Sequence, residues 1–333
     1  MNPFAIAQPR SFDEAAATVA DKRFSLAVIK AGGMDVVDHL KEGLYQPDVV
    51  INIKRLRSQP GAQPITQNGN EIRIEATATM AEIAASDIIR RSAPVLSQSL
   101  ENTASPQVRN VGTAAGNLLQ RPRCWYYRHE QFDCLKKGGA TCFAVEGENK
   151  FHAIFGDGPC HIVHPSNLAP ALAVCNGVVY LTGSARKSIP ISALFHMPDK
   201  GVRTESELQP GEIITHITAE ARPQSGFCAL KEKQSFDWPM VAASVAIELD
   251  GSTIKSARVC AGAVAPIPWD LPSVASALKG VNVDDDASLR KACSGAATGA
   301  KPMTDNAYKV KLLPVVVRRA VLVAAGRKTE VDA

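Results

Sequence analysis

The sequence of 333 residues is poor in aromatic side chains, has little excess of either charge, and contains no long apolar run. It holds 10 Phe, 5 Tyr and 3 Trp, and its 37 basic and 33 acidic residues leave a net charge of +4. The two signs are interspersed, so the basic face of a nucleic-acid binder is absent. The apolar run from Leu312 is interrupted by Arg318 and Arg319 and is shorter than the roughly 18 residues that a spanning helix needs. We therefore expect neither nucleic-acid binding nor membrane insertion.

The N-terminus also lacks the basic start and apolar core of a secretory signal. This absence predicts a cytoplasmic protein, or a periplasmic one if a partner with a signal carries it across a membrane. A charged fraction of 21% and an apolar fraction of 45% are typical of globular chains and exclude extensive disorder. The length predicts two or three domains with a sizeable core.

Cysteine is distributed unevenly along the chain. Half of the eight cysteines lie within 37 residues, in the same stretch as three consecutive aromatic residues. These cysteines are Cys124, Cys134, Cys142 and Cys160. The stretch has little helical or strand periodicity and is long for a connection inside a domain, which favours a functional loop.

Apolar periodicity predicts a mixture of helices and strands on both sides of this stretch. Ser11 is a suitable N-cap for a helix over 12–19, and Gly43 ends a predicted helix that starts near Asp35. Strands are expected over 25–32, 49–56 and 71–79, with one helix over 80–92. From about residue 222 the pattern predicts a C-terminal α/β unit.

Two glycine-rich segments are suited to binding an anion. KAGGMD, Lys30–Asp35, lies between a predicted strand and a predicted helix, where free backbone N–H groups can face a phosphate. Taken alone, it is more typical of a tight turn that binds nothing, since it is neither GxGxxG nor a P-loop. The second segment, Thr103–Gln120, is dense in small and amide side chains that allow a ligand to approach the backbone. The pair predicts a dinucleotide held between two lobes.

Both segments resemble the flavin-binding segments of a known family. AGGMD and SPQVRNVGTAAGNL are similar to AGGTD and QIRNxGTxGGNL in the FAD subunit of molybdenum hydroxylases, the xanthine dehydrogenase and carbon monoxide dehydrogenase family. Met34 replaces the usual Thr, and Ala115 replaces a Gly. The resemblance continues through HPSNLAPAL, PGEIITHI, SFDWPMVAASVAIEL and NAYKVKLLPVVVRRAVL, and so covers nearly the whole chain.

The resemblance implies an α+β fold. It consists of a two-lobed PCMH-type FAD-binding domain and a C-terminal α/β domain of the CO dehydrogenase flavoprotein type. The implied boundaries are 1–60 for the first FAD-binding lobe, 61–221 for the second lobe, and 222–333 for the C-terminal domain. The second lobe carries an insertion over about 121–163.

The resemblance also implies the residues that hold FAD. The first loop contributes Ala31, Gly32, Gly33, Met34 and Asp35. The second wall is formed by Ser105, Asn110, Gly112, Thr113, Gly116 and Asn117. Ser166 and Asn167 replace the family's usual Ser-Asp pair. Lys231 and Lys233 replace a basic pair near the isoalloxazine ring, where positive charge favours the reduced anionic flavin. No catalytic residue is assigned.

The four clustered cysteines have several interpretations from the residues alone. Four thiolates suit a four-iron four-sulfur cluster or a structural zinc ion, although no CxxC spacing is present. A disulfide framework and unremarkable buried thiols are the alternatives. Four other cysteines sit singly in apolar contexts and are expected to be packed thiols: Cys175, Cys228, Cys260 and Cys293.

A subset of the family favours the iron interpretation. Subunits similar to those of 4-hydroxybenzoyl-CoA reductase and bacterial aldehyde oxidoreductases carry a 4Fe-4S cluster in an insertion directly after the GNL segment. The resemblance implies Cys124, Cys134, Cys142 and Cys160 as ligands, with a histidine ligand from His161 or His164 as a minor option. Five cations of the insertion either offset the charge of the cluster or form a solvated face: Arg121, Arg123, Arg128, Lys136 and Lys137.

Together these features predict an FAD-binding electron-transfer subunit of a multi-subunit molybdenum hydroxylase. A molybdopterin-binding large subunit would oxidise the substrate, and a small subunit with 2Fe-2S clusters would relay electrons. The flavin would exchange them with an acceptor that the sequence does not identify. The alternatives are a stand-alone FAD-dependent oxidase and a zinc-stabilised scaffold without enzymatic activity.

Overall fold

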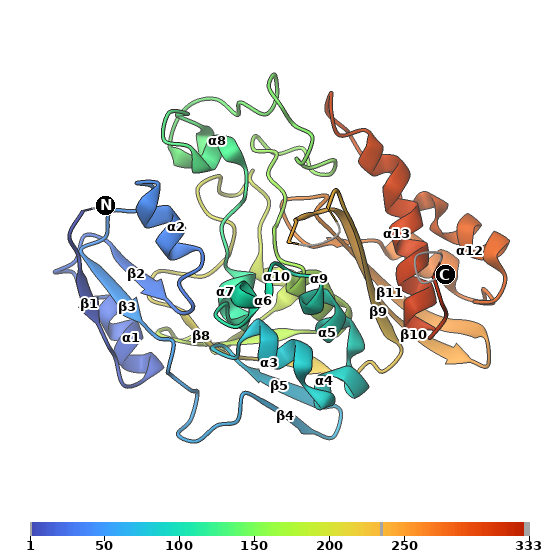
Figure 1. Ribbon diagram of the computed structural model, residues 1–333, viewed down its shortest axis with the longest axis horizontal. Helices are drawn as coiled ribbons and strands as arrows, with labels where there is room; N and C mark the ends of the chain where they lie inside the picture. The colour runs from blue at the N-terminus through green and yellow to red at the C-terminus, as the bar shows by residue number, and fades with distance from the viewer. Residues whose placement is uncertain (1, 234–235, 330–333) are drawn as a thin grey trace.

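The computed structural model describes residues 2–233 and 236–329, and it contains three sheets that follow one another along the chain (Figure 1). The first is a three-stranded parallel sheet in the order β1-β3-β2. Its strands are β1 (Ala5–Ala7), β2 (Ala27–Lys30) and β3 (Val49–Asn52), with α1 (Phe12–Val19) and α2 (Val36–Lys41) between them. Ser11 caps α1 by accepting a hydrogen bond from the backbone of Glu14, and Gly43 follows α2 with a φ of 72°. Both predicted helix ends are thus confirmed.

The second sheet is antiparallel and has five strands in the order β4-β5-β8-β6-β7. These are β4 (Ile65–Asn68), β5 (Glu71–Glu75), β6 (Val178–Thr182), β7 (Ser188–Pro190) and β8 (Ile213–Glu220). The accompanying helices are α3 (Met80–Ala85), α4 (Asp87–Ser92), α5 (Pro94–Glu101), α6 (Pro106–Arg109), α7 (Ala114–Leu118), α9 (Leu168–Val174) and α10 (Ile191–Leu194). One apolar core joins this region to the first sheet.

Several predicted elements are shorter or divided in the structure: the strand expected over 25–32 spans Ala27–Lys30, and the strand expected over 71–79 ends at Glu75. The helix expected over 80–92 is divided into α3 and α4 at Ser86, which has extended backbone angles and caps α4 through its side chain. A serine satisfies the free N–H groups of a new helix start better than it suits a helix interior, which explains the break. The strand expected over 49–56 ends at Asn52, where the pairing of β3 with β2 stops.

The third sheet is antiparallel in the order β12-β11-β10-β9. Its elements are β9 (Ser225–Lys231), β10 (Pro239–Asp250), β11 (Thr253–Gly262), β12 (Trp269–Asp270), α11 (Pro272–Leu278), α12 (Asp286–Cys293), the 3₁₀ turn η2 (Ser294–Ala297) and α13 (Tyr308–Ala324). A second core is buried between α13 and this sheet through residues such as Leu313, Val316 and Val317. Within the described ranges, no helix is long and apolar enough to span a membrane.

The insertion follows α7 and contains only α8 (Trp125–Arg128) and the 3₁₀ turn η1 (Leu135–Lys137) as regular elements before α9. It lies across the top of the molecule between α2 and α13 (Figure 1). On the α13 side it is held by Lys309, which is fully buried. The Lys309 ammonium donates to the carbonyls of Phe151, His152 and Ala263 at 3.0, 2.9 and 2.8 Å. Burial lowers the pKa of Lys309 to about 7, and the three carbonyls supply the partners that a buried amine requires.

Replacing this lysine tests whether α13 anchors the insertion. Lys309→Met retains much of the volume but leaves three buried carbonyls without their donor, so we expect a loss on the order of 2 kcal/mol in the free energy of unfolding. Lys311→Met, at an exposed position of the same helix, should change it by less than about 0.5 kcal/mol. Denaturant titrations measure both, and equal stabilities of the two variants would contradict the anchoring role.

Candidate functional site: a two-loop cavity and a cysteine cavity

The two glycine-rich segments meet on the wall of one cavity of about 410 Å³. Residues 31–35 line it from the turn between β2 and α2, and the second segment contributes Gly112, Thr113, Gly116 and Asn117 around the start of α7. Two loops that lie about 80 residues apart in sequence therefore face the same space. This volume falls within the range typical of small-molecule and cofactor sites.

Glycine is required where the two loops touch. A Cβ atom on Gly32 would lie 2.2 Å from the carbonyl oxygen of Val111, so any side chain there would push the loops apart. Gly33 has a φ of 87°, a backbone conformation that other residues rarely adopt. The second loop is also held by α3, because the backbone N–H of Met80 donates to the carbonyl of Gly112 at 2.8 Å.

Several residues of this wall escape prediction from the sequence. The apolar ones come from strand ends and from α3 and include Val28, Ile29, Ile53, Met80, Ile213 and Ile214. The polar and aromatic ones include His39, Tyr45, Gln120, Arg121, Arg123 and Trp238. No motif marks them, because they come from separate segments of the chain that only the tertiary fold brings together.

Four residues predicted to bind FAD lie behind the cavity wall instead of lining it. Ser105 caps α6, and Asn110 ends it. The Ser166 hydroxyl donates to Oδ1 of Asn117 at 2.6 Å. Nδ2 of Asn167 donates to the Thr103 hydroxyl at 3.0 Å. Ser166 and Asn167 thus orient side chains that do line the cavity, because Asn117 and Thr103 both belong to its wall.

The predicted basic pair also lies outside the lining residues. The Lys231 ammonium donates to the carbonyl of Asn102, and the backbone N–H of Lys233 donates to the carboxylate of Asp237 at 3.0 Å. The cations on this wall are Arg121 and Arg123, and the guanidinium of Arg123 lies 4.9 Å from the ring centre of Trp238. Residues 234–235, which include the first serine of the SFDWP segment, fall outside the described ranges.

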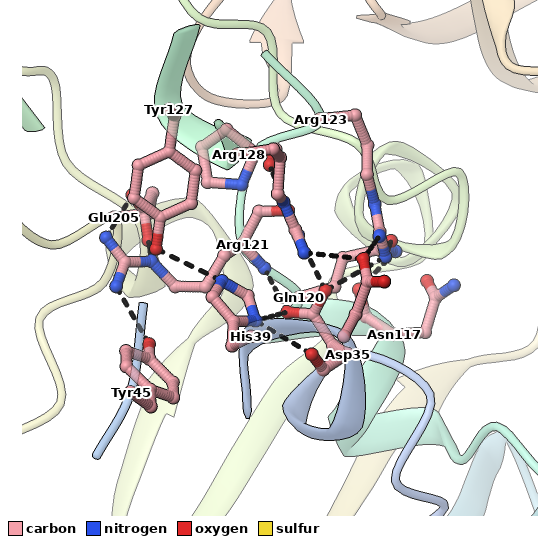
Figure 2. A network of polar contacts seen from close by, with 12 residues as sticks. Asp35, His39, Tyr45, Asn117, Gln120, Arg121, Arg123, Tyr127, Arg128 and Glu205 are labelled. Atoms are coloured by element: carbon pink, nitrogen blue, oxygen red, sulfur yellow. Dashed lines mark hydrogen bonds and ion pairs between the residues drawn. The ribbon is translucent and has the colours of Figure 1, made fainter. Parts of the chain in front are cut away.

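Asp35 forms the centre of a polar network between the first glycine loop and the insertion (Figure 2). Its carboxylate lies 2.7 Å from Arg128 and 3.0 Å from Arg123, and it accepts a 2.8 Å hydrogen bond from the backbone N–H of Arg121. Burial alone would raise the pKa of Asp35, but the two guanidinium groups outweigh it and hold the pKa below its usual value. The carboxylate therefore ties the first glycine loop to the insertion.

Arg121, Arg128 and Lys136 also bind partners outside the insertion, whereas Lys137 donates to the carbonyl of His129 within it. Arg128 also reaches Asp38 at 2.9 Å, and the buried Lys136 lies 2.6 Å from Glu205. Arg121 bonds Tyr45 and lies against Glu205 (Figure 2). Their main role is thus to attach the insertion to the rest of the fold, which the sequence had not shown.

The four clustered cysteines line a second, much smaller cavity within the insertion. Its wall comprises Cys124, Tyr126, Tyr127, Cys134, Leu135, Lys136, Cys142, Phe143, His152, Cys160, His161 and Ile162, and its volume is about 10 Å³. All four are free thiols, so the disulfide alternative does not apply to them.

Hydrogen bonds and burial shift the pKa values of three of these thiols. The hydrogen bond from Cys160 lowers the pKa of Cys142 to about 5 and raises the pKa of Cys160 in turn. Burial raises the pKa of Cys124 to about 11, although backbone N–H groups of the following turn oppose this. Backbone N–H groups of His161 and Ile162 face the sulfurs of Cys142 and Cys160, respectively.

Among the described residues, no group of three or more His, Cys, Asp or Glu side chains is placed to hold a metal ion. The predicted metal ligands thus share one cavity without forming a single-ion site. His161 lines that cavity, whereas His164 lies on the wall of a neighbouring cavity of about 350 Å³. That third cavity borders Arg123 and Trp238 on one side and Cys124 and His152 on the other.

Two known protein families match consecutive parts of the chain. Residues 2–219 match the FAD-binding domain in molybdopterin dehydrogenase, and residues 226–324 match the C-terminal domain of the CO dehydrogenase flavoprotein. The chain belongs to this molybdenum hydroxylase flavoprotein family. It is an FAD-binding oxidoreductase subunit, as the sequence predicted.

Relatives of this flavoprotein cover nearly its whole length. It is 31% identical to the aldehyde oxidoreductase FAD-binding subunit PaoB of Escherichia coli (strain K12). The alignment spans 307 residues and covers 90% of this chain and 91% of PaoB. It is 25% identical to the carbon monoxide dehydrogenase medium chain of Afipia carboxidovorans, over 89% of this chain and 88% of that one.

Solved structures share its fold. The Cu,Mo-CO dehydrogenase structure matches with a TM-score of 0.74 at 22% identity, covering 98% of this chain and 100% of that chain. Quinoline 2-oxidoreductase from Pseudomonas putida 86 matches with the same TM-score at 18% identity, covering 98% of each chain. The predicted fold, an FAD-binding domain followed by a C-terminal flavoprotein domain, is confirmed.

A substitution at the contact between the loops tests the two-loop cavity. Gly32→Ala places a methyl group against the carbonyl of Val111, so we expect FAD to bind at least about tenfold more weakly, or about 1.4 kcal/mol. Gly295→Ala, where the nearest atom lies at 3.6 Å, is the matched control and should bind FAD normally. Fluorescence titration of the apoprotein with FAD measures both affinities, and normal binding by Gly32→Ala would contradict the assignment.

The Asp35 network predicts an acid-sensitive attachment of the insertion. Because the pKa of Asp35 is lowered in the folded state, its contribution to stability is present above the ordinary carboxyl pKa of about 4 and is lost as the pH falls through the folded value. Asp35→Asn removes this contribution at every pH.

We expect Asp35→Asn to cost about 3 kcal/mol, since two partly buried guanidinium groups lose their partner. Asp38→Asn, at the more exposed member of the network, should cost less than about 1 kcal/mol. Unfolding free energies measured from pH 7 to pH 3 check both values. A wild-type protein that loses no more stability in acid than Asp35→Asn would refute the mechanism.

Proposed function

We propose that the two-loop cavity binds FAD and that the chain transfers electrons between this flavin and the other redox centres of a multi-subunit molybdenum hydroxylase. The observation that carries the proposal is the meeting of both glycine loops on one wall, within residues that match an FAD-binding domain. Bound FAD supplies reversible transfer of one or two electrons.

The residues of this chain contribute binding and orientation. Backbone N–H groups around Gly32 and Gly33 are suited to the pyrophosphate because no side chain obstructs them. Of the remaining predicted FAD contacts, Gly112, Thr113, Gly116 and Asn117 line the cavity, and Ser166 and Asn167 act through Asn117 and Thr103. Ser105, Asn110, Lys231 and Lys233 are not among the lining residues. Arg123 and Trp238 close the side that faces the insertion.

We further propose that the cysteine cavity holds a 4Fe-4S cluster ligated by Cys124, Cys134, Cys142 and Cys160. The donor set fits this group, because four free thiols from one insertion surround a single space. Backbone N–H groups directed at three of the sulfurs would stabilise bound thiolates. Since the present cavity has a volume of only about 10 Å³, it would have to widen to accept the cluster. A bound cluster would supply one-electron transfer.

The relatives named as subunits or medium chains argue against a stand-alone oxidase. We therefore propose a molybdopterin-binding large subunit and a 2Fe-2S small subunit as partners, with substrate oxidation on the large subunit.

Cofactor analysis of the anaerobically purified chain tests both proposals separately. We expect one FAD together with about four iron and four labile sulfide ions per chain. Cys134→Ser should lose the iron and its broad visible absorption and retain the flavin bands, whereas Cys228→Ser, outside the insertion, should retain both. Flavin without iron would exclude the cluster and leave the flavin site standing, and zinc in place of iron would favour the scaffold.

A further inference from the structure

His152 occupies a distinctive position beside the proposed cluster. Its Nε2 atom lies 3.3 Å from the Sγ atom of Cys124, and its ring lines the cysteine cavity. The residue is 4% exposed, so water does not compete for this contact. Within the sequence, His152 stands alone and has no metal-ligand spacing to a neighbour.

The fold holds this imidazole firmly. The carbonyl of His152 accepts hydrogen bonds from Lys309 at 2.9 Å and from Nδ2 of Asn306 at 3.2 Å, both in the C-terminal domain. Its ring meets Trp125 edge-to-face, with the ring centres 5.6 Å apart. The backbone and the ring are therefore fixed from opposite sides, and Nε2 is directed at sulfur.

We propose that His152 is a positioning residue that donates an N–H···S hydrogen bond from Nε2 to Cys124 and thereby raises the reduction potential of the cluster. This inference rests on the proposed 4Fe-4S site. An iron-bound thiolate carries no proton, so sulfur is the acceptor and the imidazole is the donor. A hydrogen bond to a thiolate ligand is stronger when the cluster carries its extra electron, because sulfur is then more negative.

The arrangement also links the C-terminal domain to the cluster. Lys309 and Asn306 do not reach Cys124 themselves, but they hold the backbone from which the imidazole reaches it. Outer-shell partners of this kind are known to tune a metal centre through its ligands. His129 offers a matched comparison, because it belongs to the same insertion, is exposed, and its ring accepts a hydrogen bond from the backbone N–H of Gln131 in its own turn.

The test compares His152→Ala, His152→Gln and His129→Ala in the full chain, purified anaerobically. Midpoint potentials of the cluster are followed by EPR, and those of the flavin by visible absorption in the same titration. For His152→Ala we expect the reduced cluster to be about tenfold less favoured, a shift of about 59 mV to lower potential, with the flavin potential unchanged. His152→Gln retains an N–H donor and should recover most of the shift, and His129→Ala should match the wild type.

The outcomes separate this inference from the proposed function. A wild-type chain without iron would refute the cluster and the inference with it. Iron at the wild-type potential in both His152 variants would refute only the role of His152. Loss of iron from both variants with FAD retained would mean that the ring is needed for packing and not as a donor. Loss of iron from His152→Ala alone would support the hydrogen bond.

Discussion

The carboxylate of Asp35 stands directly after the glycine turn that lines the two-loop cavity, and it binds two guanidinium groups of the insertion. A partly buried carboxylate and two arginines are stable together because each neutralises the other, and separating them would strand charge away from water. The insertion therefore cannot lift from α2 without disturbing the turn beside the cavity. The proposed flavin and cluster sites depend on this one electrostatic contact for their relative placement.

A second attachment operates from the C-terminal side. Lys309 and Asn306 replace the missing secondary structure of the insertion by donating to its backbone carbonyls. A segment with few regular elements is thus held at both ends by buried polar bonds, one set from the first sheet region and one from α13. Such a segment can present four thiols in a defined arrangement even though its own backbone forms little helix or strand.

Local physical chemistry explains why much of the molecule was accessible from the sequence. The cap at Ser11 and the stop at Gly43 depend on their own backbone neighbours, and the glycine density of the two loops reflects a need for close approach at Gly32. The break at Ser86 followed the same local rule but was hidden within a continuous apolar pattern. Arg123 and Trp238 had no local signal, because they lie far apart in the sequence and meet only in the tertiary structure.

The sequence by itself determined the family, the two loops that border the cavity, and the concentration of cysteine after the second loop. These features are carried by short runs of neighbouring residues. The tertiary structure decided which cations pair with which carboxylates, which carbonyls the Lys309 ammonium reaches, and which histidine faces a sulfur. Arg128 and Asp35 lie 93 residues apart, and Lys309 lies 157 residues from His152. Contacts over such separations depend on how whole elements pack, and no run of neighbouring residues encodes them.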